Sequence, residues 1–162
     1  MNRRSFAKNL LLTFTALFAA RGWAQSPPTL DECTEFLVPN INNLSGTING
    51  NNDRSQISFD GTKVTLETYY YEIRFNLSEM NPNDVKVVSA YLDYRASRIV
   101  FKSAGLKSVI AHKWLHKGSG PQPSDRYFCD ALVFKDEDVA NKVAKALQAA
   151  IVAAGGKGSR FD

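Results

Sequence analysis

Residues 127–156, YFCDALVFKDEDVANKVAKALQAAIVAAGG, carry the clearest structural signal in the chain. Asp136 is a typical helix N-cap residue, and the two acidic residues after it complement the positive end of a helix. Gly155 and Gly156 are typical of a helix end. An apolar stripe steps by three and four residues through Val139, Val143, Leu147, Ile151 and Ala154. The pattern predicts a strand that runs directly into a long amphipathic helix, one face of which packs against a sheet.

The preceding segment, residues 56–134, has the pattern of antiparallel strands. Ile57 and Phe59 alternate with polar residues before Asp60-Gly61, which is a tight hairpin signal. The apolar alternation slips by one residue near Thr68, which predicts a bulge or a strand break. We expect the later strands at residues 85–94, 98–103, 106–116 and 127–134. The count is therefore about six strands, or seven if the chain breaks near Thr68.

The start of the domain predicts a second helix. Thr29 and Glu32 form a capping box, and apolar residues follow at helical spacing up to Leu37. We expect this helix to end near Pro39 or Asn40. The run from 40 to 53 is rich in Asn and Gly, which favour turns, and predicts a flexible polar loop.

This element order defines the fold class as α+β. It predicts a bent antiparallel sheet or partly open barrel, with an N-terminal helix and a long C-terminal capping helix. The absence of strand-helix-strand alternation excludes the parallel nucleotide-binding sheets. The order resembles the pleckstrin-homology-like superfold, in which a C-terminal helix closes one end of a seven-stranded bent barrel. The resemblance covers about 100 residues and no functional motif, and it implies a module that binds peptides, proteins or lipid headgroups.

The first 24 residues have the three zones of a secretory signal peptide. A basic start with Arg3 and Arg4 precedes an apolar run at residues 10–20 and small residues before an expected cut after Ala24. The apolar run has about 11 residues, whereas a membrane-spanning helix needs roughly 20. We therefore expect a periplasmic or secreted mature protein without a stable membrane anchor.

Residues 2–8, NRRSFAK, resemble the twin-arginine export signal, which has two arginines followed by any residue, Phe, an apolar residue and Lys. Thr13 and Thr15 make the apolar run only moderately hydrophobic, and Arg21 adds a charge near the cut. These features favour export in the folded state. The general secretory route stays open as the alternative.

Removal of the signal changes the charge of the chain. The full sequence has 20 Lys and Arg against 16 Asp and Glu, and four of the basic residues leave with the signal. The remaining chain is formally neutral, which is not typical of nucleic-acid-binding proteins. We expect a linker at residues 25–28, one globular domain at residues 29–156 and a flexible tail at residues 157–162.

The sequence contains two cysteines, Cys33 and Cys129. Export to an oxidising compartment predicts a disulfide between them, and two buried free thiols are the alternative. The chain has no C-x-x-C motif, so neither a thiol oxidoreductase nor a cysteine zinc site is expected.

Two histidines mark the strand expected at residues 106–116. His112 and His116 have the spacing of a helical zinc site, but the apolar alternation around them predicts a strand. Leu106 and Ile110 are expected on the same face as both histidines. Because strand positions four apart are separated by roughly 13 Å, one metal ion does not bind both side chains. No metal site is therefore expected.

Trp114 lies between the two histidines and is a candidate contact residue, because Trp is enriched at binding hot spots. A role in the core remains the alternative. The sequence has neither a G-x-S-x-G nucleophile motif nor a glycine-rich loop that opens a helix, and we expect no catalytic residue and no cofactor.

These observations predict an exported binding or accessory module for a protein or peptide partner. Exposed strand edges accept a further strand from a partner, and Trp114, His112 and His116 are the predicted partner-binding residues. The polar loops at residues 40–53 and 117–125 are expected to contribute. The alternative is a small enzyme or an apolar-ligand carrier that uses the interior of the bent sheet. The oligomeric state is not predicted by any feature of the sequence.

Overall fold

The computed structural model describes residues 26–42, 45–48, 51–68, 71–89, 96–115 and 123–158. The predicted signal peptide with its cut near Ala24, His116 and the end of the predicted tail lie outside these residues.

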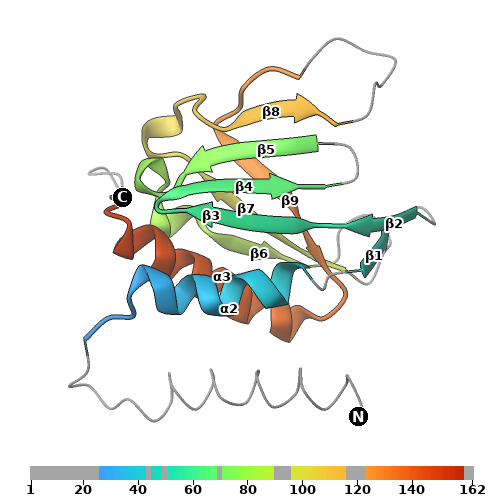
Figure 1. Ribbon diagram of the computed structural model, residues 1–162, viewed down its shortest axis with the longest axis horizontal. Coiled ribbons are helices and arrows are strands. Elements are labelled where there is room, and N and C mark those ends of the chain that lie inside the picture. The colour runs from blue at the N-terminus through green and yellow to red at the C-terminus, as the bar shows by residue number, and fades with distance from the viewer. Residues whose placement is uncertain are drawn as a thin grey trace.

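Two antiparallel sheets, a short hairpin and two helices make up the described chain (Figure 1). The strands are β1 (Ser45–Ile48), β2 (Asn51–Arg54), β3 (Gln56–Asp60), β4 (Lys63–Glu67), β5 (Tyr71–Asn76), β6 (Lys86–Val88), β7 (Ser97–Lys102), β8 (Ala111–Trp114) and β9 (Phe128–Phe134). The helices are α2 (Leu30–Asn42) and α3 (Glu137–Ala153), with single 3-10 turns η1 (Leu77–Glu79), η2 (Pro82–Asp84) and η3 (Ala104–Leu106). The predicted α+β class, with one helix before the strands and one after them, is confirmed.

The sheets have the orders β3-β4-β5-β8 and β6-β7-β9, seven strands in all. A backbone bridge between Ile110 and Arg126 connects the start of β8 to the start of β9. The rings of Phe75 in one sheet and Phe101 in the other lie 5.0 Å apart. Because β3 and β6 do not pair with each other, the bent layer is not closed among the described strands.

The predicted strand break near Thr68 is confirmed. β4 ends at Glu67 and β5 begins at Tyr71, and the Thr68 backbone N–H donates to the Tyr71 carbonyl at 2.8 Å. The turn resets the alternation, so that Leu66 and Ile73 face each other in register and are both buried. The apparent slip in the sequence pattern is therefore a hairpin with one buried face.

Helix α2 begins at the predicted capping box. The Glu32 carboxylate accepts from the Thr29 backbone N–H at 2.8 Å, and the Thr29 hydroxyl accepts from the Glu32 N–H at 3.3 Å. The helix continues through Pro39 to Asn42, which is beyond the predicted end. The extra turn places Ile41 in the core, where it is fully buried. Burial of this apolar residue stabilises a turn that the local signals disfavour.

The prediction of a loop at residues 40–53 was wrong. Strands β1 and β2 pair from Ser45 opposite Arg54 to Ile48 opposite Asn51. The two residues between the paired ends are Asn49-Gly50, the strongest two-residue hairpin signal. The hairpin was not predicted because strands were identified by alternating apolar residues, and residues 45–54 are almost all polar.

Helix α3 confirms the pattern that predicted it. The Asp136 carboxylate accepts from the N–H groups of Asp138 and Val139 at 2.9 and 3.2 Å. Gly155 follows the helix with φ of 85°. Four alanines, Ala140, Ala144, Ala146 and Ala150, are buried beside the predicted stripe. These small side chains widen the buried face, since α3 packs against α2 as well as against the strands.

The expected disulfide between Cys33 and Cys129 is not present in the structure. Cys33 and Cys129 are free thiols in the structure, and both side chains are fully buried. Cys33 belongs to α2, which packs against α3 and β3, whereas Cys129 lies in β9 opposite Phe101 of β7. Burial raises the pKa of Cys33 to about 11 and that of Cys129 to about 12, so both are neutral at pH 7. Each thiol therefore acts as a small apolar core residue.

Both cysteines are expected to resist iodoacetamide at pH 8 in the folded protein and to react when urea unfolds it without a reductant. The reagent requires an accessible thiolate, and burial with a raised pKa removes both conditions. Intact mass spectrometry before and after unfolding measures the number of labels. Labelling that appears only after a reductant is added would show that the two residues form a disulfide.

Candidate functional site

Two strand edges of the bent layer are covered by other parts of the fold. At β3, the side chain of Asn42 accepts from the Ile57 backbone N–H at 2.6 Å and donates to its carbonyl at 3.5 Å. At β6, helix α3 packs alongside, and the Ser89 hydroxyl donates to the Glu137 carboxylate at 2.8 Å. Both arrangements hinder the addition of a further strand at these edges.

Strand β8 forms a third edge, against which neither helix packs extensively, while residues 123–126, which lead into β9, run beside its first residues (Figure 1). Ile110 and Arg126 exchange two backbone hydrogen bonds of 2.9 Å, so the polar groups of Ile110 point away from β5. Successive residues of an antiparallel strand alternate in this direction. The backbone N–H and C=O of His112 therefore point toward the outer edge, and those of Lys113 point toward β5.

An aromatic cluster lies on the inner face of this edge. Tyr71 and Trp114 are opposite each other in register, with ring centroids 4.5 Å apart and planes 27° apart. His112 meets the Tyr71 ring edge-on at 6.4 Å. All three side chains are half-buried. Trp114 is thus neither a fully buried core residue nor a fully exposed contact, and Tyr71 supports one side of its ring.

His112 is held as a neutral side chain. Burial lowers the pKa of His112, the hydrogen bond to the Ile110 carbonyl opposes that shift, and the Arg126 charge adds to it. Asp130 and Asp125 raise the pKa by smaller amounts. The ring Nδ1 lies 3.1 Å from the Ile110 carbonyl oxygen, to which it donates when the proton of the neutral ring is on Nδ1. With a pKa below its usual range, His112 is uncharged at pH 7.

The predicted site residues are brought together in part. Ile110, His112 and Trp114 share the inner face as expected, since the first is buried and the others are half-buried. The prediction for Leu106 was wrong. Leu106 lies in η3 with φ of 55° and is 59% exposed, because the strand begins only at Ala111.

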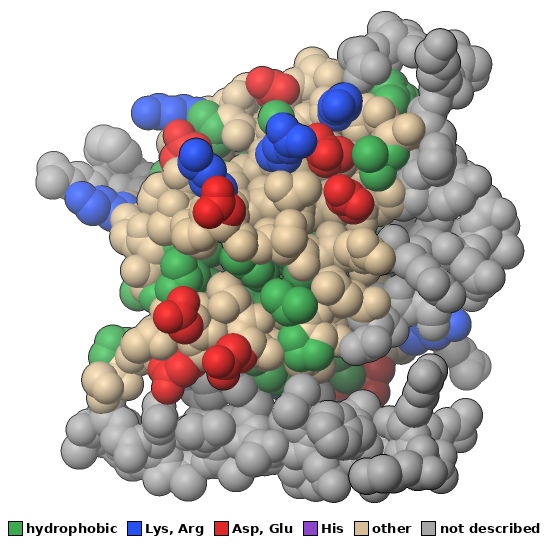
Figure 2. Space-filling view, in the orientation of Figure 1, with side chains coloured by type: hydrophobic (Ala, Val, Ile, Leu, Met, Phe, Trp, Pro, Cys, Tyr) green, Lys and Arg blue, Asp and Glu red, His purple; other side chains and the backbone are tan. Residues whose placement is uncertain are grey.

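The opposite, outer face of the four-stranded sheet is polar. In Figure 2, acidic and basic side chains lie close together over this sheet, and hydrophobic side chains gather between it and α2. Near β8 the Glu72 carboxylate bonds to the Arg74 guanidinium at 2.9 Å and lies opposite Lys113 in register. The sequence did not indicate this charge cluster, because it depends on which strand pairs with β5.

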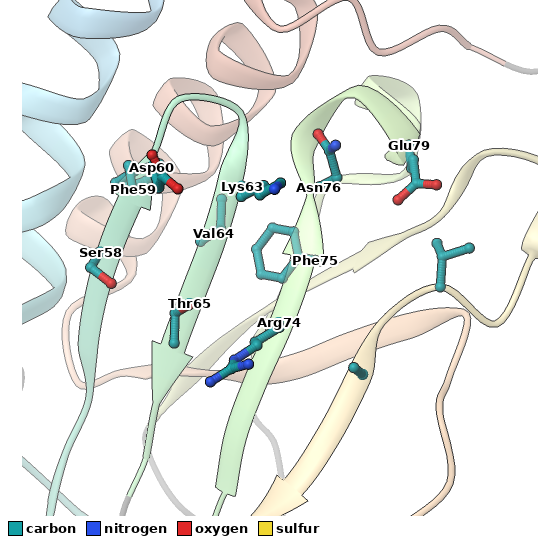
Figure 3. A pocket seen from close by; sticks show the side chains of 12 residues that line it. Ser58, Phe59, Asp60, Lys63, Val64, Thr65, Arg74, Phe75, Asn76 and Glu79 are labelled. Atoms are coloured by element: carbon teal, nitrogen blue, oxygen red, sulfur yellow. The ribbon is translucent and has the colours of Figure 1, made fainter.

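An open hollow of about 540 Å³ extends over the same face from β3 to Ala111. Figure 3 shows Arg74 beside Thr65 at one end, with Lys63, Asn76 and Glu79 at the other. Its charged side chains have both signs, so the hollow as a whole does not select for anions or cations. It continues the polar surface beside β8.

Within the described ranges, no helix is long and apolar enough to span a membrane. The same residues contain no group of three or more His, Cys, Asp or Glu side chains arranged to hold a metal ion. No family model, curated protein or solved structure matches the chain.

Proposed function

We propose that this protein is an exported binding module that captures a protein or peptide partner at the edge of β8. The observation that carries the proposal is the outward direction of the His112 backbone, at an edge against which neither helix packs extensively in the described part of the chain. Main-chain hydrogen bonds to an added strand supply affinity in this mode of recognition, and side-chain surfaces supply specificity. The stacked Tyr71 and Trp114 rings provide such a surface beside the edge.

Export is the other half of the proposal and is supported by the sequence of the first 24 residues, with Arg3 and Arg4 before a short apolar run. The resemblance to the pleckstrin-homology-like superfold also supports a binding role. That resemblance rests on the order of elements in the sequence, and the pairing of β5 with β8 departs from a succession of consecutive hairpins. Because fold alone does not define function, this resemblance is secondary to the edge geometry.

The interior of the bent layer favours a binding module over an apolar-ligand carrier. Large side chains from both sheets are fully or almost fully buried there, among them Leu66, Ile73, Phe75, Phe101 and Leu132. The hollow between β3 and Ala111 lies on the outer face, where most of its lining side chains are polar. A carrier needs an enclosed apolar cavity.

Replacement of His112 by proline is expected to weaken partner binding about tenfold relative to His112→Ala. Both variants lose the imidazole, but only proline also removes the outward N–H. Proline is tolerated at edge positions whose N–H does not serve the sheet. The loss of the hydrogen bond from the His112 N–H leaves a carbonyl group of the bound peptide without a donor. This costs about 1.4 kcal/mol, which corresponds to a factor of ten in Kd. Peptides selected from a displayed random 12-residue library supply the probes, and fluorescence anisotropy measures Kd.

The two variants must first have similar circular dichroism spectra and melting temperatures. Equal affinities of His112→Pro and His112→Ala for the selected peptides would contradict the assignment of the site to the β8 edge. A tenfold difference that is absent between Val87→Pro and Val87→Ala, on the β6 edge beside α3, would support it.

A further inference from the structure

We infer that residues 123–125 form a strap that competes with a partner for the β8 edge. The strap closes by extending the antiparallel pairing of Ile110 with Arg126, which places Ser124 opposite His112. The inference rests on the proposed function and adds its regulation, since the protein covers the binding edge with its own chain whenever the strap is closed.

The strap is already anchored in the register that closure needs. Ile110 and Arg126 form an antiparallel bridge with two backbone hydrogen bonds of 2.9 Å. The next hydrogen-bonded pair of such a ladder lies two residues along each strand, and it consists of His112 and Ser124. The backbone N–H and C=O of His112 point toward this side of β8. Closure therefore gives both groups a partner on Ser124 without a shift of register.

The pairing stops at Arg126 in the structure, which shows the open strap. Residues 123–125 have no regular secondary structure, and β8 has β5 as its neighbour in the sheet order. The strap nevertheless stays near the edge. Besides burial, which lowers the pKa of His112 most, the Arg126 charge lowers it and the Asp125 charge raises it, so both side chains lie near the ring.

The open and closed states of the strap are close in free energy. Closure adds two backbone hydrogen bonds, and it orders two residues that are otherwise outside a strand. The net stabilisation from two such bonds is comparable in size to the conformational entropy that two residues lose. A partner strand that forms the same bonds with His112, and also contacts the Tyr71 and Trp114 rings, therefore displaces the strap.

Pro123 is compatible with the closed strap. In the extended register it lies opposite Lys113, whose backbone groups point toward β5. The backbone of Pro123 then points away from β8, so its missing N–H leaves no group of the sheet without a partner. A residue without a donor on the outer side hinders the addition of a further strand. The closed strap thus converts the open β8 edge into a protected one.

A disulfide across the closed strap tests the inference. Lys113→Cys combined with Pro123→Cys places two thiols in a non-hydrogen-bonded pair, whose Cα atoms lie about 4.5 Å apart, within the range that a disulfide spans. We expect the bond to form on oxidation, to weaken binding of the selected peptides about tenfold or more, and to release the edge on reduction. Lys63→Cys with Pro123→Cys is the matched control, because β5 separates β4 from β8, and it should form no such bond. Peptide mapping by mass spectrometry identifies the bond.

Ser124→Pro and Ser124→Ala measure the competition without a covalent bond. Both variants lose the hydroxyl, but only proline also removes the N–H that donates to the His112 carbonyl in the closed strap. Because the two states have similar populations, we expect Ser124→Pro to bind the selected peptides about twofold more tightly than Ser124→Ala. Equal affinities would contradict a strap that competes for the edge.

The outcomes separate this inference from the proposed function. If Lys113→Cys with Pro123→Cys forms no disulfide while His112→Pro still weakens peptide binding, the edge binds strands and the strap is wrong. If the disulfide forms but the selected peptides bind as tightly as before, they bind elsewhere, and both proposals are wrong.

Discussion

Replacement of Phe101 by alanine is expected to lower the free energy of unfolding by about 4 kcal/mol. Phe101 lies in β7, is fully buried, and its ring lies 5.0 Å from that of Phe75 in the other sheet. Its removal takes away apolar burial and leaves a cavity at the junction of the two sheets, where rigid strands on both sides limit relaxation. Urea denaturation followed by circular dichroism measures the change.

Val152→Ala is the matched control, because this residue lies on α3 but is 54% exposed. Its expected effect is within about 0.5 kcal/mol. A loss of less than about 1 kcal/mol for Phe101→Ala would contradict the packing of the two sheets into one core. Phe101 is not part of the β8 edge, so its variant should bind selected peptides normally at temperatures where it remains folded.

The helix starts could be predicted because their signals are local. The pairs Thr29 with Glu32 and Asp136 with Asp138 lie within a single turn, and each forms the expected hydrogen bonds. The end of α2 could not be predicted in this way. Pro39 disfavours a continued helix locally, but burial of Ile41 depends on elements that are distant in sequence.

The face on which each β8 side chain lies could be predicted from the sequence, but the strand that pairs with β8 could not. Alternation placed His112 and Trp114 on one face, and the structure confirms that placement. The partner strand of β8 is β5, which is separated from it by β6 and β7 in the sequence. The stack on Tyr71 and the cluster of Glu72 with Lys113 follow only from that pairing. The compositional rule that predicted a disulfide likewise contains no information on which elements pack together.

The chain after α3 is held against the rest of the domain at Gly156. Its backbone N–H donates to the Ile151 carbonyl at 2.8 Å. A Cβ at this position would lie 2.4 Å from the Ile151 Cγ2, and 2.8 Å from the carbonyl oxygens of Ile151 and Met80. Two of these three atoms belong to the backbone, so a rotamer change does not relieve the contact.

Gly156→Ala is therefore expected to destabilise the domain by about 2 kcal/mol, in the range of overpacked core sites. The added methyl group must displace either the last turn of α3 or the segment around Met80, which is fully buried and pairs with Ser103. Lys157→Ala, at the exposed neighbouring position, should leave stability unchanged within about 0.5 kcal/mol. Urea denaturation of both variants measures the difference. Only Gly156 requires a close approach of the backbone, so the two variants should differ in stability. Equal stability would contradict this close packing and would mean that the chain end separates from the Met80 segment at little cost.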